Sequence, residues 1–480
     1  MPGRDIFLLL LAIALMGCHA ERPDISAEAA SLTGLENAIT FHEAPEPLTA
    51  ETPVPETLTP LQAVRMALAH DPRIQAALAR VRMAEADANQ ARLLPNPIVT
   101  IDVRFPVSSG NTVFEPTLTA DLISILEKPA TIAAADNRLR GSAANALIVV
   151  LDVISEVEQA YSATRAAQGQ IENARARQQL LRQLRDIAQK RLEAGDATRL
   201  DVLTLDSQLM QSTLDMSDLG LQQETQRMTL ARLIGMPLSD APWQLAPWEA
   251  PQQTKPDGES AWIETAMHCR PEISAKRWEL RALGDDLKAA DLAPLQGDAI
   301  GVHAEHDGSW RLGPTITIPI PIFDWGQAAH AKLEAQRMAT RHELLQQRRE
   351  IVQDIRLAYA TYMHSMTALA DARDKLLPLQ RQQIEQARLA YQSGEADLAT
   401  LLLAETDLQL TQSKMIDLKE KVTVARIKLQ RAAGGAAVAD RLASGPATAP
   451  TTAPATLPAT APATLPATLP TSQSTTGSTP

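Results

Sequence analysis

Aromatic residues and cysteines are scarce in this sequence, and their scarcity excludes several kinds of protein. Phe, Trp and Tyr make up 3% of the 480 residues, which leaves little bulky material to fill a wide globular core. The two cysteines, Cys18 and Cys269, cannot form a disulfide framework. A nucleophile elbow, a phosphate-binding glycine loop and a ligand set with zinc spacing are also missing. The sequence therefore predicts no catalytic residue, no metal site and no cofactor, and an envelope-anchored enzyme has no motif in its favour.

Two further features argue against nucleic-acid and metal binding. The formal net charge of −12 gives no reason to expect nucleic acid as a partner. His303, Glu305 and His306 look like a metal cluster, but they lie in a segment that reads as a strand. Residues three apart on a strand point to opposite faces, so His303 and His306 are not expected to hold one ion together.

The N-terminus carries the longest apolar run, Ile6 to Met16, which follows Arg4. This run is too short to span a bilayer, which needs about 20 residues, and it is typical of a secretion signal. Its end, Leu15-Met16-Gly17-Cys18, resembles the bacterial lipobox, so we expect Cys18 to be lipidated. The alternative is a plain signal peptide with an incidental cysteine.

The segment from Ala188 to Gly235 occurs twice, because adding 199 to each position gives a second copy without a gap. Matched pairs include Gly195 and Gly394, Leu209 and Leu408, Met216 and Met415, Arg232 and Arg431, and Gly235 and Gly434. A shared register over such a length indicates that the chain is two copies of one unit. We divide it into a lipoprotein signal peptide (1–17), an extended N-terminal segment (18–57), a first repeat (58–236), an inter-repeat linker (237–258), a second repeat (259–435) and a disordered tail rich in Pro, Ala and Thr (436–480).

Each repeat combines long helical segments with two short segments of period two. One helix, or two nearly continuous ones, of about 60 residues is expected from about 131 to 193, and so long a helix must find parallel partners. Strands are expected at about 97–105, 114–123, 299–306 and 310–320, where apolar and polar residues alternate. Their spacing and length fit tilted strands that cross a bilayer, and the alternative is a soluble hairpin packed on the helices.

Four membrane strands cannot close a barrel, and lipid does not tolerate an open sheet edge. Three chains would supply twelve strands and share one pore. The predicted fold is therefore mainly α with a membrane β-barrel portion: two tandem repeats, a long periplasmic α-helical barrel and four transmembrane strands per chain, closed as a 12-stranded barrel in a trimer.

With these features the chain resembles the TolC-like outer-membrane efflux proteins over about residues 58 to 435. The resemblance rests on the doubled architecture, on Leu93-Leu94-Pro95-Asn96-Pro97, on the segment from Ile318 to Gly326, and on the turns around Gly195 and Gly394. The Leu-Leu-Pro-Asn-Pro segment looks most like the cobalt–zinc–cadmium heavy-metal efflux branch. One departure is Leu126-Glu127-Lys128-Pro129, where relatives have a glycine-rich basic turn, so the junction between the second strand and its helix is expected to differ.

The resemblance implies a passive duct and not an enzyme. Its members act as homotrimeric exit ducts, and this chain is expected in the outer membrane, lipid-anchored and extending into the periplasm. They pair with a periplasmic adaptor (membrane fusion) protein and an inner-membrane pump of the RND or another type. On this reading the chain carries metal cations or small toxic compounds to the outside, and it contacts outer-membrane lipid. The alternative is a lipid-anchored periplasmic coiled-coil scaffold, which explains the helices but not four alternating strands at repeated positions.

The resemblance also suggests site residues at the two turns. Gly195, Asp196, Gly394 and Glu395 are expected to dock the adaptor, although glycines at these places also simply terminate helices. Asp201 matches an aspartate that narrows the family's periplasmic mouth, and Arg199 is its candidate partner. Thr400 and Leu403 stand where the second repeat of relatives has aspartates, and an ordinary exposed helix charge is the alternative for Asp201.

Overall fold

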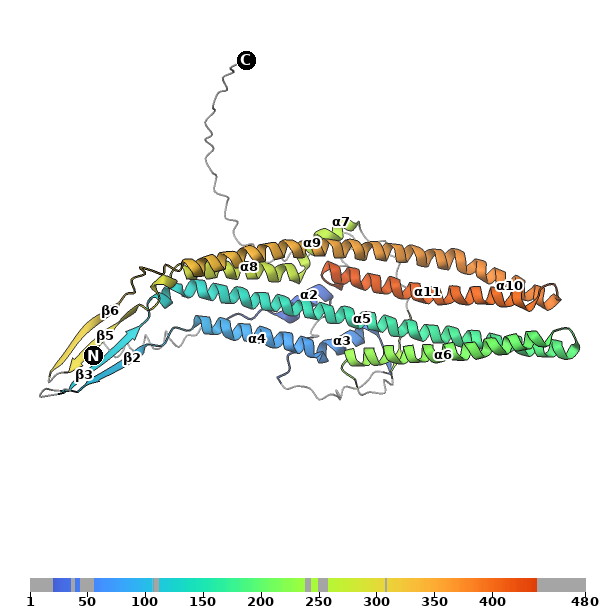
Figure 1. Cartoon of the computed structure of the whole chain (residues 1–480), viewed down its shortest axis with the longest axis horizontal. Coiled ribbons are helices and arrows are strands. Elements are labelled where there is room, and N and C mark those ends of the chain that lie inside the picture. Colours follow the sequence, from blue (N-terminus) through green and yellow to red (C-terminus); the bar gives the residue numbers. More distant parts are fainter. Residues whose placement is uncertain are drawn as a thin grey trace, which may run out of the picture.

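The computed structural model describes residues 20–35, 39–43, 56–105, 107, 112–237, 243–248, 258–306 and 309–437. The molecule is elongated, with a small sheet at one end and two helical hairpin tips at the other (Figure 1). Short helices and a two-stranded ribbon lie near the middle of its length. No described helix holds an apolar stretch long enough to cross a bilayer.

The two repeats contain corresponding helices. In the first repeat these are α3 (Pro60–His70), α4 (Pro72–Arg92), α5 (Ile123–Ala194) and α6 (Arg199–Leu233), and α2 (Ile25–Thr33) precedes them in the N-terminal segment. In the second half they are α7 (Glu259–Cys269), α8 (Pro271–Ala290), the 3₁₀ turn η1 (Ala293–Leu295), α9 (Gln327–Asp371), the π turn η2 (Ala372–Leu376), α10 (Leu377–Ser393) and α11 (Leu398–Ala433). Pro72 and Pro271 each begin a helix, because proline fits the first turn but not a helix interior.

The helices form a layer of four rows. Helix α5 packs against α4 and α6 on one side and against α8 and α11 on the other, while α9 packs against α8 and α11. The rows containing α4 and α6 and the rows containing α9 and α10 are therefore the two outer edges of the layer. Apolar residues fill three clusters along it, of which the last, at the hairpin tips, is shared by both repeats.

Helix α5 is longer than the sequence predicts. It has 72 residues, about 108 Å, and begins at Ile123 instead of near residue 131. Pro129 lies inside the helix, close to its start. Asp298 accepts hydrogen bonds from the backbone N–H groups of Leu122 and Ile123, at 3.1 Å each, and so satisfies donors that the first turn leaves open.

The segment 18–57 is not wholly extended as predicted, because Ile25–Thr33 forms helix α2. Asp24 caps this helix by accepting a hydrogen bond from Ala27 N at 3.0 Å. Ile25 and Ala29, one turn apart, are buried in the core around α5. The pattern was missed because a nine-residue helix shows only two turns of periodicity.

The π turn η2 explains a change of register between the repeats. Tyr161 and Tyr359 are 198 residues apart, whereas Gly195 and Gly394 are 199 apart. The second repeat therefore holds one extra residue between these points, and η2 lies there. A π turn absorbs a single inserted residue without breaking the helix, so the hairpin tips stay aligned.

Four antiparallel strands form one sheet in the order β2-β3-β5-β6. They are β2 (Ile98–Arg104), β3 (Val113–Ala120), β5 (Ala299–His306) and β6 (Trp310–Thr317). The second strand ends three residues before the predicted 123, because α5 starts there. The fourth ends before the predicted 320, because Pro319 and Pro321 have no N–H to donate. Gly301 lets β5 approach β3: a Cβ there would lie 2.0 Å from Leu118 O.

A parallel ribbon of β1 (Thr57–Leu58) and β4 (Gln244–Leu245) ties the linker to the start of the first repeat. Trp243 beside it is buried, with the guanidinium of Arg227 4.6 Å from its ring centre. The mainly α fold with tandem repeats and a small sheet agrees with the predicted fold class.

Candidate functional site

The sheet has one apolar and one polar face, as the alternation predicts. The pairing register places on one face Val99, Ile101, Val103, Phe114, Pro116, Leu118, Ala120, Ile300, Val302, Ala304, His306, Trp310, Leu312, Pro314 and Ile316. The opposite face is polar except at strand ends, and carries Ile98, Thr100, Asp102, Arg104, Val113, Glu115, Thr117, Thr119, Ala299, Gly301, His303, Glu305, Arg311, Gly313, Thr315 and Thr317. Such a sheet separates an apolar medium from water, because each face suits only one of them.

Polar side chains pair across the strands on the polar face. Thr117 Oγ1 lies 2.8 Å from His303 Nδ1, and Arg104 forms an ion pair with Glu115. His303 thus points to the polar face, whereas His306 stacks against Trp310 with ring centres 4.9 Å apart on the other face. Among the described residues no cluster of three or more His, Cys, Asp or Glu side chains could hold a metal ion.

The two hairpin tips are built alike. Gly195 and Gly394 end their helices in the left-handed conformation, with φ of 87° and 78°. In each tip the next residue donates back to the last turn: Asp196 N to Arg191 O at 2.8 Å, and Glu395 N to Ala390 O at 2.9 Å. Glycine is needed here for the left-handed backbone and not for lack of space, because a Cβ at either position would meet no atom within 4 Å. It leaves the Asp196 and Glu395 side chains exposed at the end of the molecule.

A contact between the two tips was not foreseen from the sequence. Arg191 Nη1 donates to Tyr391 O at 3.2 Å, and the guanidinium lies 4.8 Å from the Tyr391 ring centre. Buried apolar residues from both hairpins surround this contact. Arg191 and Tyr391 do not correspond to each other in the repeat, so only the packing of the two hairpin tips brings them together.

Asp201 caps helix α6. Its carboxylate accepts hydrogen bonds from Thr198 N and Thr198 Oγ1, both at 2.9 Å, and Thr198 Oγ1 accepts from Asp201 N. In the described part of the chain Asp201 is thus bonded to Thr198 and not to Arg199, which is exposed. The second repeat exchanges the two residue types: Asp397 caps α11 and accepts from Thr400 N at 2.9 Å. The Thr-x-x-Asp capping pattern was readable in the sequence.

A buried ion cluster joins the two repeats midway along the helices. Arg431 Nε donates to Asp152 at 2.7 Å and its Nη2 donates to Glu272 at 2.8 Å, while Arg270 also binds Glu272. Burial raises the pKa of Glu272, but the hydrogen bond from Arg270 and the charge of Arg431 lower it to about 2.

The first repeat has charged residues at two matching positions, but their signs are exchanged. Asp71 and Arg73 stand where the second repeat has Arg270 and Glu272, and Arg73 binds both Asp71 and Glu156.

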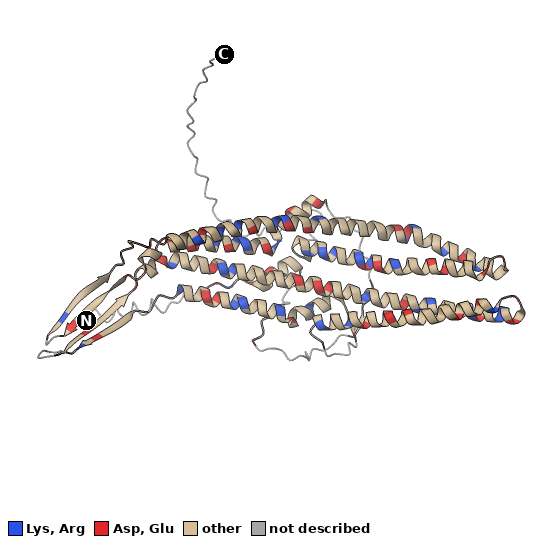
Figure 2. Ribbon diagram, viewed as in Figure 1, with Lys and Arg blue, Asp and Glu red and all other residues tan. Residues whose placement is uncertain are grey.

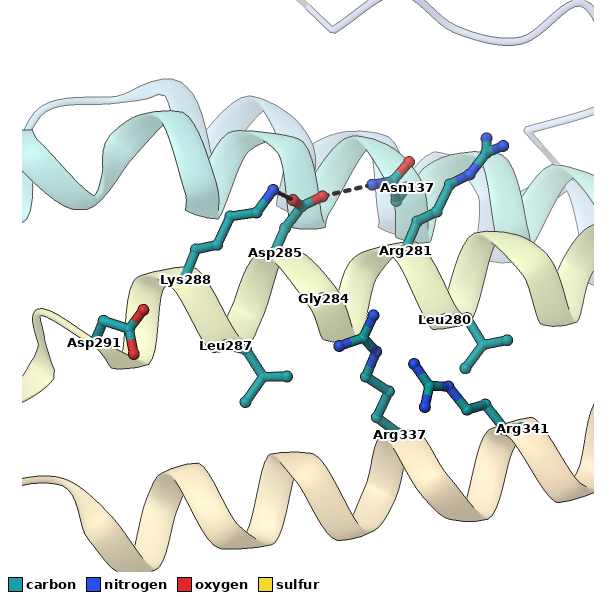
Figure 3. A pocket seen from close by; sticks show the side chains of 10 residues that line it. All are labelled: Asn137, Leu280, Arg281, Gly284, Asp285, Leu287, Lys288, Asp291, Arg337 and Arg341. Carbon is teal, nitrogen blue, oxygen red and sulfur yellow. Dashed lines mark hydrogen bonds and ion pairs between the residues drawn. The ribbon is translucent and has the colours of Figure 1, made fainter. Parts of the chain in front are cut away.

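A groove of about 680 Å³ lies between α8 and α9 near the sheet. Figure 3 shows Arg337 and Arg341 pointing from α9 towards α8, and Asp285 held between Lys288 and Asn137. Four cationic and two acidic side chains line it, so the groove is positively charged: Arg281, Lys288, Arg337, Arg341, Asp285 and Asp291. None of these residues belongs to a motif, and sequence reasoning did not single them out. Elsewhere charges of both signs alternate along the helices, while the strands carry few (Figure 2). Cys18 lies outside the described residues.

Comparison with known proteins gives one consistent result. The family described as "Outer membrane efflux protein" matches residues 63–236 and 262–435. The chain is 25% identical to the "Pyoverdine export outer membrane protein OpmQ" of Pseudomonas aeruginosa over 79% of this chain and 85% of that protein. Among solved structures it resembles the outer-membrane channel OprN (TM-score 0.66, 19% identity, 88% of this chain and 97% of that chain). It also resembles CusC (TM-score 0.67, 18% identity, 83% of this chain and 98% of that chain).

Proposed function

Because this chain belongs to the outer membrane efflux protein family and is an outer-membrane efflux channel of tripartite systems, we propose that three copies close into one continuous duct. The duct performs no chemistry. It leads from an inner-membrane pump and a periplasmic adaptor to the outside.

The two-faced sheet is the observation that carries this proposal. A single chain leaves β2 and β6 as open edges, and unpaired backbone groups cost several kcal/mol each in lipid. Pairing β2 of one chain with β6 of the next removes every edge and yields a barrel of twelve strands. The apolar face then meets lipid and the face with Thr100, Thr117 and Thr315 lines the water-filled lumen.

The tips are proposed as the adaptor-docking surface. Gly195 and Gly394 shape the turns, and Asp196 and Glu395 present exposed carboxylates beyond them. A chain with Asp196→Lys and Glu395→Lys is expected to form normal trimers in the outer membrane yet fail to restore export. Glu224→Lys makes the same charge change on α6, roughly 38 Å from the tip, and is expected to leave export intact. Normal export by the double variant would refute docking at these residues.

For Asp201 we propose two roles at once: it caps α6, and three copies of it narrow the periplasmic mouth. Its position beside the tip, with Arg199 exposed next to it, supports the second role. The negative charge of three carboxylates would attract cations, and their mutual repulsion would favour an open ring.

The heavy-metal branch is proposed from the segment Leu93–Pro97, and lipid anchoring from Cys18. A strain without this chain is expected to become sensitive to cobalt, zinc or cadmium rather than to organic dyes. Because a relative is named for pyoverdine export, accumulation of pyoverdine in the periplasm of a producing host is the third measurement. If deletion of the gene impairs none of these exports, the efflux role in its host is refuted. Radiolabelled palmitate should enter the unaltered chain and not a Cys18→Ala variant.

A further inference from the structure

The interface between the repeats has a defined register. Helix α5 meets α11 through the Arg431–Asp152 ion pair at 2.7 Å. Further along, Gln170 Nε2 donates to Asp417 Oδ1 at 2.8 Å and to Ser413 O at 3.1 Å. These contacts follow one antiparallel alignment of the two helices.

The repeat carries this alignment onto the outer edges of the chain. Arg431 corresponds to Arg232 on α6 at the offset of 199. Asp152 corresponds to Glu350 on α9, because the offset is 198 in this part of the helix. The correspondence is structural as well: Val153 and Ile351 are both fully buried. Arg232 and Glu350 therefore repeat the charges of Arg431 and Asp152, but they lie on opposite edges of the layer.

The edge residues are exposed where their counterparts are buried. Ile427, at the inter-repeat interface, is 4% exposed, whereas its counterpart Met228 on α6 is 62% exposed. Met228 on the α6 edge thus matches a residue that the internal interface buries.

A second set of opposite charges lies along the same two edges. Glu405 and Arg177 correspond to Asp206 on α6 and Lys375 at the π turn. The signs are again complementary. In the single chain Asp206 binds Arg185 and Lys375 binds Asp371, both at exposed positions that leave them able to exchange partners.

We propose that the α9 edge of one chain receives the α6 edge of a second copy in the register in which α5 receives α11, with Glu350 paired to Arg232 of the second copy. This inference rests on the trimeric duct proposed above and specifies its interface. The two edges are different surfaces, so the contact is head-to-tail and repeats until a ring closes. Met228 is buried beside the ion pair when the ring forms.

Cysteine crosslinking tests the register in the full-length protein in membranes, with Cys269→Ser as background. Arg232→Cys combined with Glu350→Cys is expected to give dimers and trimers on mild oxidation, resolved on a non-reducing gel. Arg232→Cys with Gln336→Cys is the control, because Gln336 lies on α9 roughly 21 Å from Glu350 and should not crosslink. Asp152→Cys with Arg431→Cys should crosslink within one chain, without a change in oligomer mass.

Charge exchange tests the ion pair itself. Arg232→Glu and Glu350→Arg each place like charges opposite one another at three interfaces, and each should raise the dissociated fraction in detergent roughly tenfold. The double exchange should restore the trimer. Trimers that form without the Arg232–Glu350 crosslink and without this rescue would overturn the register while leaving the duct intact. Absence of any trimer in the unaltered protein would instead overturn the duct.

Discussion

Replacing Ile101 by Arg tests which face of the sheet meets lipid. Ile101 is the middle residue of the seven-residue strand β2, lies opposite Pro116 on the apolar face, and is 59% exposed in a single chain. An arginine near the bilayer midplane costs about 2–4 kcal/mol on the lipid face of a barrel. With three copies the penalty is roughly 6–12 kcal/mol per trimer. We expect the variant to remain unassembled and to be degraded or recovered outside the outer-membrane fraction.

Thr100→Arg is the matched control, because Thr100 precedes Ile101, is also exposed, and lies opposite Thr117 on the polar face. It should insert normally, since a lumen-facing arginine stays in water. The assay compares the yield of detergent-extracted, heat-modifiable trimer and its urea stability for the two variants. Equal insertion of both, or failure of Thr100→Arg alone, would show that the assignment of the two faces is wrong.

Two further changes have distinct expected outcomes. Glu272→Gln should reduce the loss of stability at low pH. The pKa of Glu272 in the folded protein is about 2, below the ordinary 4.5, so its ion pairs with Arg270 and Arg431 stabilise the fold above pH 4.5. This stabilisation is lost as the pH falls towards 2. Thermal unfolding followed by circular dichroism between these pH values checks it, and an unchanged acid limb would contradict it. Asp201→Ala should cost about 1 kcal/mol of local stability through the lost cap with Thr198, seen as faster hydrogen exchange at the start of α6, and should also weaken cation selectivity in bilayer conductance. Faster exchange without a change in selectivity would leave Asp201 a capping residue only.

The periodicity of apolar residues predicted most of the fold from the sequence alone. The alternation around Ile101 and Val302 predicted both the strands and their two faces, because a period of two admits only one division of the side chains. The offset between Gly195 and Gly394 predicted the duplicated hairpins. Both signals are local or repeated, so a single sequence is enough to detect them.

The contacts that connect distant segments could not be predicted in this way. The Arg191–Tyr391 contact depends on how two hairpins pack, and neither residue recurs at the repeat offset. The early start of α5 depends on Asp298, which is supplied by the other repeat. By contrast, the capping role of Asp201 was readable, but the family resemblance directed attention to a pore instead.

The ion cluster at the middle of the molecule makes the second half depend on the first for part of its charge balance. Arg270 and Arg431 share Glu272 within the second half, and Asp152 of the first half supplies a further carboxylate 2.7 Å from Arg431. A second half produced alone would therefore keep both guanidinium groups at Glu272 and lose the carboxylate that faces Arg431 across the repeat boundary.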